Sequence, residues 1–142
     1  KESLKAFDIQ DGLGIKLLEQ CGILTAVITG RNSKMVLARC EELGIKHLHM
    51  GVENKAIALD EVLKTLGLSS KDCAVMGDDW PDLAMMKNAG LRVCPAQAHG
   101  AVKEFAHYVT TQTGGNSAVR ETCDLILKAQ NRYEELLNKA RQ

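Results

Sequence analysis

Hydrophobic and polar residues follow two different periods along this chain. Short apolar runs, typical of strands buried on both faces, alternate with stretches of helical periodicity that end at a glycine. The apolar runs predict strands at 23–28, 47–50, 73–76, 91–94 and 108–110. The stretches between them predict helices at 12–21, 33–43, 54–66 and from 81 to just before 90. Such alternation with short connections predicts an α/β fold with a doubly wound parallel sheet, of Rossmann type.

The two ends of the sequence carry different patterns. Residues 3–9 alternate between polar and apolar positions, which predicts a half-exposed strand and one arm of a β-hairpin. Residues 117–137 predict one amphipathic helix with apolar residues along one side. Neither an internal repeat nor a domain boundary interrupts the sequence, so we expect residues 1–142 to form a single domain.

Composition excludes several classes of protein. Lys plus Arg and Asp plus Glu both total 18, so the formal net charge is zero and no general nucleic-acid or membrane surface is expected. No apolar run approaches the ~20 residues of a membrane span. The five cysteines form no CxxC pair, which favours reduced thiols in a cytoplasmic protein and argues against a zinc site.

The first candidate site follows the strand predicted at 23–28. Ligands bind at the carboxyl ends of the strands in a doubly wound sheet, and Thr29-Gly30-Arg31 stands at such an end. A hydroxyl, a permissive backbone and the start of a helix together favour an anion, and Arg31 can add a bidentate donor. The alternative is a plain strand-to-helix turn.

The second candidate site is acidic. Gly77-Asp78-Asp79 follows the strand predicted at 73–76, and Asp82 comes three residues later. Three carboxylates so close together repel one another unless a cation lies among them, and Mg²⁺ prefers oxygen ligands. Helix capping is the alternative for Asp79 or Asp82, but it does not explain Asp78 at the end of a buried strand.

Lys55 opens the helix predicted at 54–66. A cation is unfavourable at a helix N-terminus, so its position there is explained if Lys55 points at a phosphate. An ordinary surface lysine is the alternative reading.

These clusters together resemble the haloacid dehalogenase (HAD) superfamily, with Thr29, Lys55 and Gly77-Asp78-Asp79 plus Asp82 in place of its second, third and fourth motifs. The order and spacing of further segments resemble the family of 3-deoxy-D-manno-octulosonate 8-phosphate (KDO 8-phosphate) phosphatases over essentially the whole chain. These segments are Lys5-Ala6-Phe7, Asp11-Gly12-Leu13-Gly14-Ile15, Ile28-Thr29-Gly30-Arg31, Gly114-Gly115-Asn116 and Ala118-Val119-Arg120-Glu121.

The resemblance implies a magnesium-dependent phosphoric monoester hydrolase of lipopolysaccharide precursor synthesis, which converts KDO 8-phosphate to KDO and phosphate through an aspartyl-phosphate. Its substrate is a small sugar phosphate. The implied roles are Mg²⁺ binding by Asp78, support of that ligand by Asp79 and Asp82, phosphoryl binding by Thr29, charge compensation by Lys55, and substrate binding by Gly30, Arg31 and Arg120.

The resemblance also implies an architecture. The family has no large cap domain and resembles a homotetramer in which a β-hairpin of each subunit, here 1–9, joins a central barrel. The segment 114–120 is expected to approach an active site, in its own or a neighbouring subunit. Arg120 is then a candidate for binding the carboxylate of the sugar acid, with a solvated helix residue as the alternative.

One motif of the superfamily is absent. Its first strand ends in Asp-x-Asp, which supplies the nucleophile and the general acid/base, and no Asp-x-Asp occurs in this sequence. Asp8 and Asp11 have the wrong spacing and precede a helix. The resemblance implies that this strand lies ahead of Lys1 and pairs between the strands at 23–28 and 73–76. Without it we expect unpaired strand edges and almost no hydrolysis.

Three alternatives stay open on sequence alone. A phosphatase of a nonulosonic acid 9-phosphate uses the same motifs. A non-catalytic HAD-like assembly domain, as attached to sugar-nucleotide synthetases, fits the absent first motif but not the retained charged cluster. A receiver-type domain shares the topology but needs an acidic pair on its first strand and no glycine-rich tail.

Overall fold

A computed structural model describes residues 9–113 and 117–142. The expected hairpin arm at 1–9 lies outside the described residues except for Ile9, which begins helix α2 (Ile9–Gln20) and is not in a strand. The helix therefore starts three residues before the predicted 12–21. It continues through Gly14 because α7 packs closely there: a Cβ on Gly14 would lie 3.0 Å from the Cβ of Cys123.

Strands and helices alternate as the sequence predicted, and a further helix, which the sequence did not predict, spans Gly100–Phe105. The strands are β1 (Ala26–Ile28), β2 (His47–His49), β3 (Ala74–Met76), β4 (Leu91–Cys94) and β5 (Tyr108–Val109). The other helices are α3 (Lys34–Leu43), α4 (Lys55–Leu66), α5 (Leu83–Met86), α6 (Gly100–Phe105), α7 (Ala118–Ala129) and α8 (Tyr133–Ala140), with 3₁₀ turns η1 (Ser70–Asp72) and η2 (Trp80–Asp82).

The helices α3 and α4 lie where the sequence predicted them, and a capping residue marks each end. Ser33 Oγ accepts the N–H of Val36 at 3.2 Å, and Asn54 Oδ1 accepts the N–H of Ile57 at 3.1 Å. Gly44 and Gly67 end the two helices in the left-handed region, at φ 73° and 69°, which glycine adopts at little cost.

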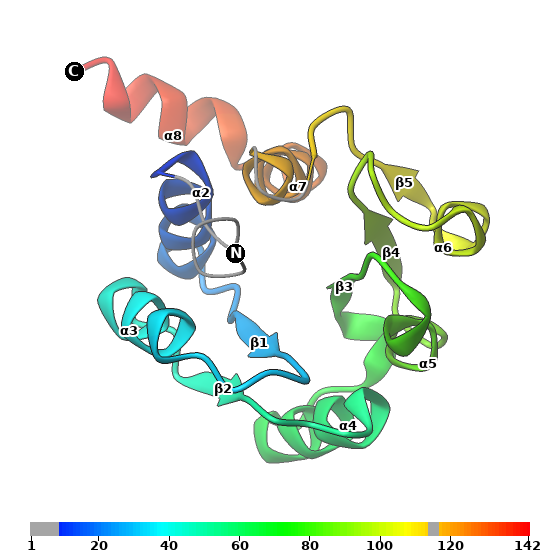
Figure 1. Ribbon diagram of the computed structural model, residues 1–142. Coiled ribbons are helices and arrows are strands. Elements are labelled where there is room, and N and C mark those ends of the chain that lie inside the picture. The colour runs from blue at the N-terminus through cyan, green and yellow to red at the C-terminus, as the bar shows by residue number, and fades with distance from the viewer. Residues whose placement is uncertain (1–8, 114–116) are drawn as a thin grey trace.

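All strand pairs are parallel, but the described strands form two sheets. β1 pairs with β2, and β3, β4 and β5 pair in that order. Among the described residues, neither β1 nor β3 has a second partner, and the two strands face each other in Figure 1. Within the described residues, each of these two strands therefore has one unpaired edge.

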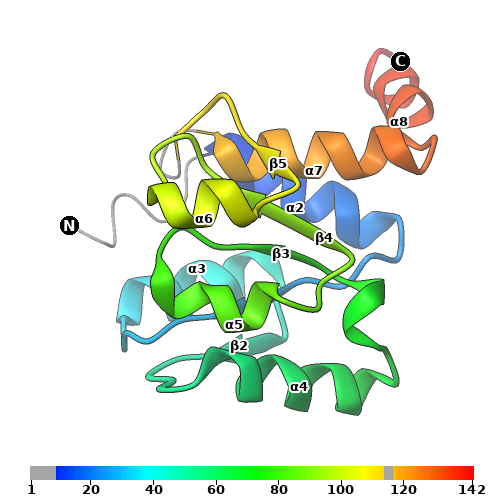
Figure 2. The same ribbon diagram turned by 90° about the vertical axis from the view of Figure 1, so that its right-hand side faces the viewer.

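Helices and side chains connect the two sheets. Helix α4 contacts both β1 and α5, and α7 packs along α2 (Figures 1 and 2). Within β1, Ile28 packs against the core around Met86 and Val102, whereas Val27 packs against the core around Leu18 and Leu127. Because successive residues of a strand point to opposite faces, β1 contributes to both cores.

Two predictions near the C-terminus need correction. The single helix expected at 117–137 is two helices, α7 and α8, because Asn131 adopts φ 59° and the N–H of Arg132 bonds to the carbonyl of Leu127. Asparagine tolerates this left-handed conformation, which ends a helix as glycine does. The helix expected from Pro81 to just before Gly90 is a 3₁₀ turn followed by the short α5.

No helix of the described residues is both long and apolar enough to cross a membrane.

Candidate active site

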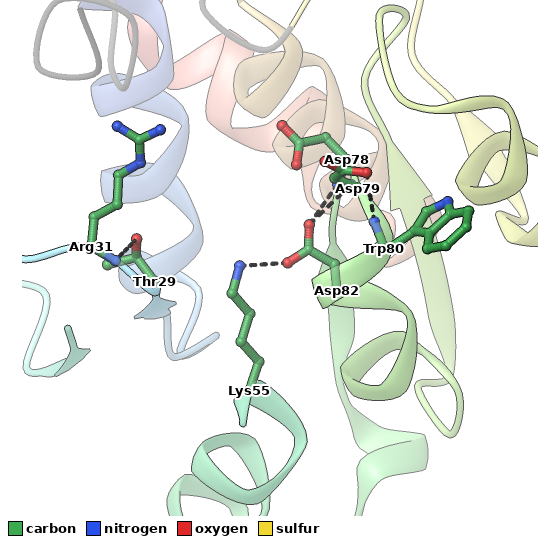
Figure 3. A network of polar contacts seen from close by, with 7 residues as sticks. All are labelled: Thr29, Arg31, Lys55, Asp78, Asp79, Trp80 and Asp82. Carbon is green, nitrogen blue, oxygen red and sulfur yellow. Dashed lines mark hydrogen bonds and ion pairs between the residues drawn. The ribbon is translucent and has the colours of Figure 1, made fainter. Parts of the chain in front are cut away.

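The candidate residues lie at the carboxyl ends of two strands and at the start of one helix. Thr29 follows β1, Asp78 follows β3 after Gly77, and Lys55 is the first residue of α4. In Figure 3, Lys55 reaches from α4 toward Asp82, with Thr29 and Arg31 on one side of it and Asp78 and Asp79 on the other. The structure thus brings the three predicted clusters to one region, although they are far apart in sequence.

Asp82 organises the acidic loop. Its Oδ2 accepts the backbone N–H groups of Asp78 at 2.8 Å and of Asp79 at 3.2 Å, and the side chain is only 7% exposed. Gly77 allows this arrangement, because a Cβ there would lie 2.4 Å from the Cβ of Asp82. The loop therefore depends on a buried carboxylate and on the absence of a side chain opposite it.

Lys55 pairs with the other oxygen of the same carboxylate. Its Nζ lies 2.6 Å from Asp82 Oδ1, and the side chain is 18% exposed. A charge-assisted hydrogen bond of this kind is stronger than a neutral one. It explains why a cation is tolerated at the start of α4, and it rules out the alternative of an ordinary surface lysine.

The pKa values of Asp78 and Asp82 shift in opposite directions. Desolvation, and then the nearness of Asp82, raises the pKa of Asp78. Burial acts in the same direction on Asp82, but the bonds from Lys55 and from the backbone of Asp78 and Asp79 outweigh it and lower its pKa. Asp82 therefore holds its negative charge in place, while Asp78 gains from any further cation beside it.

Trp80 points away from Lys55, and Asp79 bonds to the backbone of Trp80 (Figure 3). Asp79 Oδ1 accepts the N–H of Trp80 at 2.8 Å, and Asp79 and Asp82 form a reciprocal capping box around η2. The capping alternative is therefore correct for these two carboxylates. Trp80 is 63% exposed, and its indole contacts His99.

The Thr29-Gly30-Arg31 turn is shaped by its own backbone. The N–H of Arg31 donates to Thr29 Oγ1 at 3.2 Å, and the carbonyls of Thr29 and Arg31 accept from Val52 and Gly51 at 3.1 Å each. Helix α3 starts at Lys34, three residues after Arg31. The hydroxyl and the guanidinium thus project from a turn that is fixed to the loop after β2.

Arg120 lies apart from this network. Its Nε is 2.9 Å from Asp124 Oδ1 on the same helix, and its backbone N–H donates to the buried Asp11 at 2.9 Å. Within 9–113 and 117–142, no described hydrogen bond or ion pair links Arg120 to Lys55 or to the acidic loop. The start of α7 nevertheless lies on the same side of the molecule as the carboxyl ends of the strands in Figure 2.

Sequence reasoning missed two polar residues that shape this side of the molecule. Asp11 caps the first turn of α7 from another helix, and Glu121 accepts hydrogen bonds from Tyr108, Thr111 and Gln112. Neither residue follows a strand, and their partners are remote in sequence or in an irregular segment. No local sequence pattern therefore predicts their roles.

The acidic loop fits a hard divalent cation in part. Across the described parts of the chain, no three His, Cys, Asp or Glu side chains converge as a ready-made metal cage. Mg²⁺ does not require one, because it is commonly bound by one or two carboxylates together with waters and substrate phosphate. Asp78 supplies such a carboxylate, and the raised pKa of its acid group is what a nearby cation reverses.

Comparison with known families first defines the class. Residues 49–121 match the model of the haloacid dehalogenase-like hydrolases. This segment contains Lys55 and the whole acidic loop. The chain therefore contains a HAD-like hydrolase domain.

Individual relatives narrow the class. The 3-deoxy-D-manno-octulosonate 8-phosphate phosphatase of Escherichia coli is 45% identical over 134 residues, which cover 94% of this chain and 71% of the relative. The Moraxella catarrhalis phosphatase of the same name, solved with magnesium, phosphate and KDO, superposes with a TM-score of 0.91 at 46% identity, covering 94% of this chain and 77% of that one. A cobalt-bound Haemophilus influenzae phosphatase gives 0.87 at 36% identity, with 90% and 75% covered.

The chain belongs to the 3-deoxy-D-manno-octulosonate 8-phosphate phosphatase family of HAD-like hydrolases.

Proposed function

We propose that this protein hydrolyses KDO 8-phosphate to KDO and inorganic phosphate in a magnesium-dependent reaction of lipopolysaccharide precursor synthesis. The observation that carries the proposal is the contact of Lys55 with Asp82 at 2.6 Å. It joins the cation at the start of helix α4 to the acidic loop after β3, at the strand ends where such folds bind ligands.

The residues of this chain have separate roles in the proposal. Asp78 binds Mg²⁺, which when present neutralises charge on the phosphoryl oxygens. Asp82, with Asp79, fixes the loop that carries Asp78. Lys55 offsets the negative charge of the phosphoryl group and of the nucleophile, and Thr29 donates its hydroxyl to the phosphoryl oxygens.

Two further segments bind the sugar acid. Gly30 and Arg31 border the phosphoryl site, and the exposed guanidinium of Arg31 binds an anionic part of the substrate. Arg120 binds the carboxylate of the sugar acid, after exchange of its present partner Asp124. Whether it acts in its own subunit or in a neighbour depends on the assembly.

The nucleophile belongs to a strand that pairs between β1 and β3. This proposal is supported by the unpaired edges of these two parallel strands and by the absence of Asp-x-Asp from the sequence. A parallel strand there ends beside Lys55 and Asp78. One Asp then attacks phosphorus as the sugar oxygen leaves and takes a proton from the other Asp. Water hydrolyses the aspartyl-phosphate in the second step.

The coding sequence upstream of Lys1 tests the nucleophile directly. We expect it to encode an apolar strand that ends in Asp-x-Asp. The protein expressed with that segment should release phosphate, whereas residues 1–142 alone should release almost none. Full activity of residues 1–142 alone would contradict the proposed nucleophile.

Phosphate release from two substrates tests the reaction. The protein, with its upstream segment, is incubated with KDO 8-phosphate or a nonulosonic acid 9-phosphate, each with Mg²⁺ or with EDTA. We expect faster release from KDO 8-phosphate and none in EDTA. Preference for the nine-carbon substrate would instead identify the related phosphatase, and no release from either, together with no Mg²⁺ binding, would favour the assembly domain.

Separate substitutions of two lysines in helix α4 test the role of the Lys55–Asp82 contact. Lys55→Ala should lower kcat by about 100-fold or more, because it removes a fixed cation from the charge that develops in the transition state. Lys64→Ala, an exposed residue in the last turn of the same helix, is the matched control. Equal activities of the two variants would show that Lys55 has no catalytic role.

Assembly and location complete the proposal. We expect a cytoplasmic homotetramer, which light scattering on the purified protein measures. The described cysteines are all free thiols, which agrees with a reducing compartment.

A further inference from the structure

Beside the acidic loop lies a second loop, 95–99, that contacts it at two points. The backbone N–H of His99 donates to the carbonyl of Asp78 at 2.9 Å. The indole Nε1 of Trp80 donates to His99 Nδ1 at 3.3 Å, and the two rings meet edge to face with centroids 5.5 Å apart. Asp78 is therefore flanked by two attachments to the same histidine.

His99 is itself held in place by α6. Its Nδ1 also accepts the N–H of Ala101 at 3.0 Å, and its carbonyl accepts the N–H groups of Val102 and Lys103. Val102 is fully buried in the core that also contains Met86. The imidazole thus connects the exposed end of the acidic loop to a helix that is anchored in the core.

Burial in the core does not explain the position of Trp80. Its ring is 63% exposed, and it points away from Lys55 and Thr29 in Figure 3, so it neither fills the core nor walls the space between them. Burial contributes little at such exposure. The directional contact with His99 is what its position supplies.

We propose that Trp80 and His99 form a latch that positions Asp78 for magnesium. This inference rests on the proposed function, since it assigns the latch a role in binding the metal of that same site. Partners behind a metal ligand orient it, and their loss commonly weakens metal binding by about 10-fold or more. His99 and Trp80 are positioning residues here, because they act through the backbone of Asp78.

Two substitutions remove the latch in different ways. Trp80→Phe keeps an aromatic ring but loses the Nε1–H donor, and it leaves the cap of α6 intact. His99→Ala removes the acceptor of both bonds, and His99→Asn restores an oxygen acceptor at the same position, where asparagine is a good helix cap.

His107→Ala is the matched control. The Nδ1 of His107 accepts the backbone N–H of Arg92 at 2.9 Å, so this variant also deletes an exposed imidazole acceptor. It does so at the start of β4, whereas Asp78 follows the carboxyl end of the parallel strand β3.

The readout is magnesium affinity, measured by calorimetry on the protein with its upstream segment, together with the Mg²⁺ concentration that gives half-maximal phosphate release. We expect Trp80→Phe and His99→Ala each to weaken Mg²⁺ binding by about 10-fold, with kcat restored at saturating Mg²⁺. His99→Asn should recover most of the affinity, and the double variant Trp80→Phe with His99→Ala should be no weaker than His99→Ala alone.

The result separates this inference from the proposed function. If the unsubstituted protein hydrolyses KDO 8-phosphate but Trp80→Phe binds Mg²⁺ as tightly as it does, or if His107→Ala weakens binding equally, the latch is refuted and the phosphatase stands. If the unsubstituted protein neither binds Mg²⁺ nor releases phosphate, the proposed function fails and the latch fails with it.

Discussion

Removal of the Asp82 carboxylate should lower the free energy of unfolding by an unusually large amount. Its two oxygens accept bonds from Lys55 and from the backbone N–H groups of Asp78 and Asp79. Asp82→Ala leaves all three donors without this acceptor, in a place where the lysine side chain is 18% exposed. Breaking a buried pair by deleting one partner costs about 3–5 kcal/mol.

A cost of this size is a large part of the stability of a domain, which is about 5–15 kcal/mol. Urea unfolding in EDTA, followed by circular dichroism, measures it without a metal contribution. Combining Asp82→Ala with Lys55→Met should recover about 1–3 kcal/mol relative to Asp82→Ala alone, because no charged donor is then left buried without its partner.

Glu135→Ala provides the control for this measurement. It deletes the carboxylate of an ion pair with Arg132 whose side chains are 57% and 41% exposed, so we expect a far smaller loss of stability than for Asp82→Ala. If Asp82→Ala costs no more than Glu135→Ala, the argument that Asp82 organises the acidic loop is wrong.

Three further changes test the surrounding structure. Gly77→Ala should lower the free energy of unfolding by about 1–3 kcal/mol and reduce phosphate release, since its Cβ would lie 2.4 Å from that of Asp82, whereas Gly100→Ala meets no atom within 4 Å and should do neither. Burial acts to raise the pKa of Glu121, but the bonds it accepts lower it overall; its contribution to stability is therefore present above about pH 4.3 and lost as the pH falls through the lower folded pKa. The difference in melting temperature between the unsubstituted protein and Glu121→Gln should accordingly shrink on acidification, and a constant difference would contradict this. Asp11→Ala should cost about 1–3 kcal/mol in thermal unfolding, because it removes a buried acceptor from the first turn of α7.

Local sequence signals predicted helices best where a capping residue marks each end. Ser33 with Gly44, and Asn54 with Gly67, fixed both ends of α3 and α4, because a cap acts within one turn of the chain. Helix α6 was missed because it is six residues long and begins at Gly100, so it has neither the length nor the composition of a helical pattern.

Long-range contacts decided what the sequence did not predict. Helix α2 begins at Ile9, three residues before the predicted start, although Gly12 and Gly14 lower helix propensity. Atoms of Arg39 and Cys123 lie where side chains at these two glycines would be. The break at Asn131 depends on the docking of α8 residues Tyr133 and Leu136 against the core of α2 and α7. A pattern read along one segment contains no information on either contact.

The site was predicted in part for the same reason. Strand ends were enough to place Thr29 and Asp78 at one edge of the molecule. The partner of Lys55 was not foreseen, because a phosphate and a carboxylate satisfy a lysine equally well on charge alone. The capping role of Asp79 and Asp82 was weighed as an alternative to a metal, whereas the structure shows that both carboxylates cap η2 and that Asp82 also accepts the backbone N–H of Asp78.

Lys55 also has a structural consequence for the two sheets. By sequence it belongs to the β1–β2 unit, but its ammonium group contacts Asp82 of the β3–β4–β5 unit. Among the described residues, no backbone pairing joins these sheets, so their relative position depends on the packing of α4, on the packing of α7 along α2 and on this ion pair. The strand proposed between β1 and β3 would add a hydrogen-bonded ladder on each side, and Lys55 would then no longer be needed to hold the two halves together. The same lysine would share its charge between Asp82 and the anion at the end of the proposed strand, which is the condition under which it would serve catalysis instead of stability.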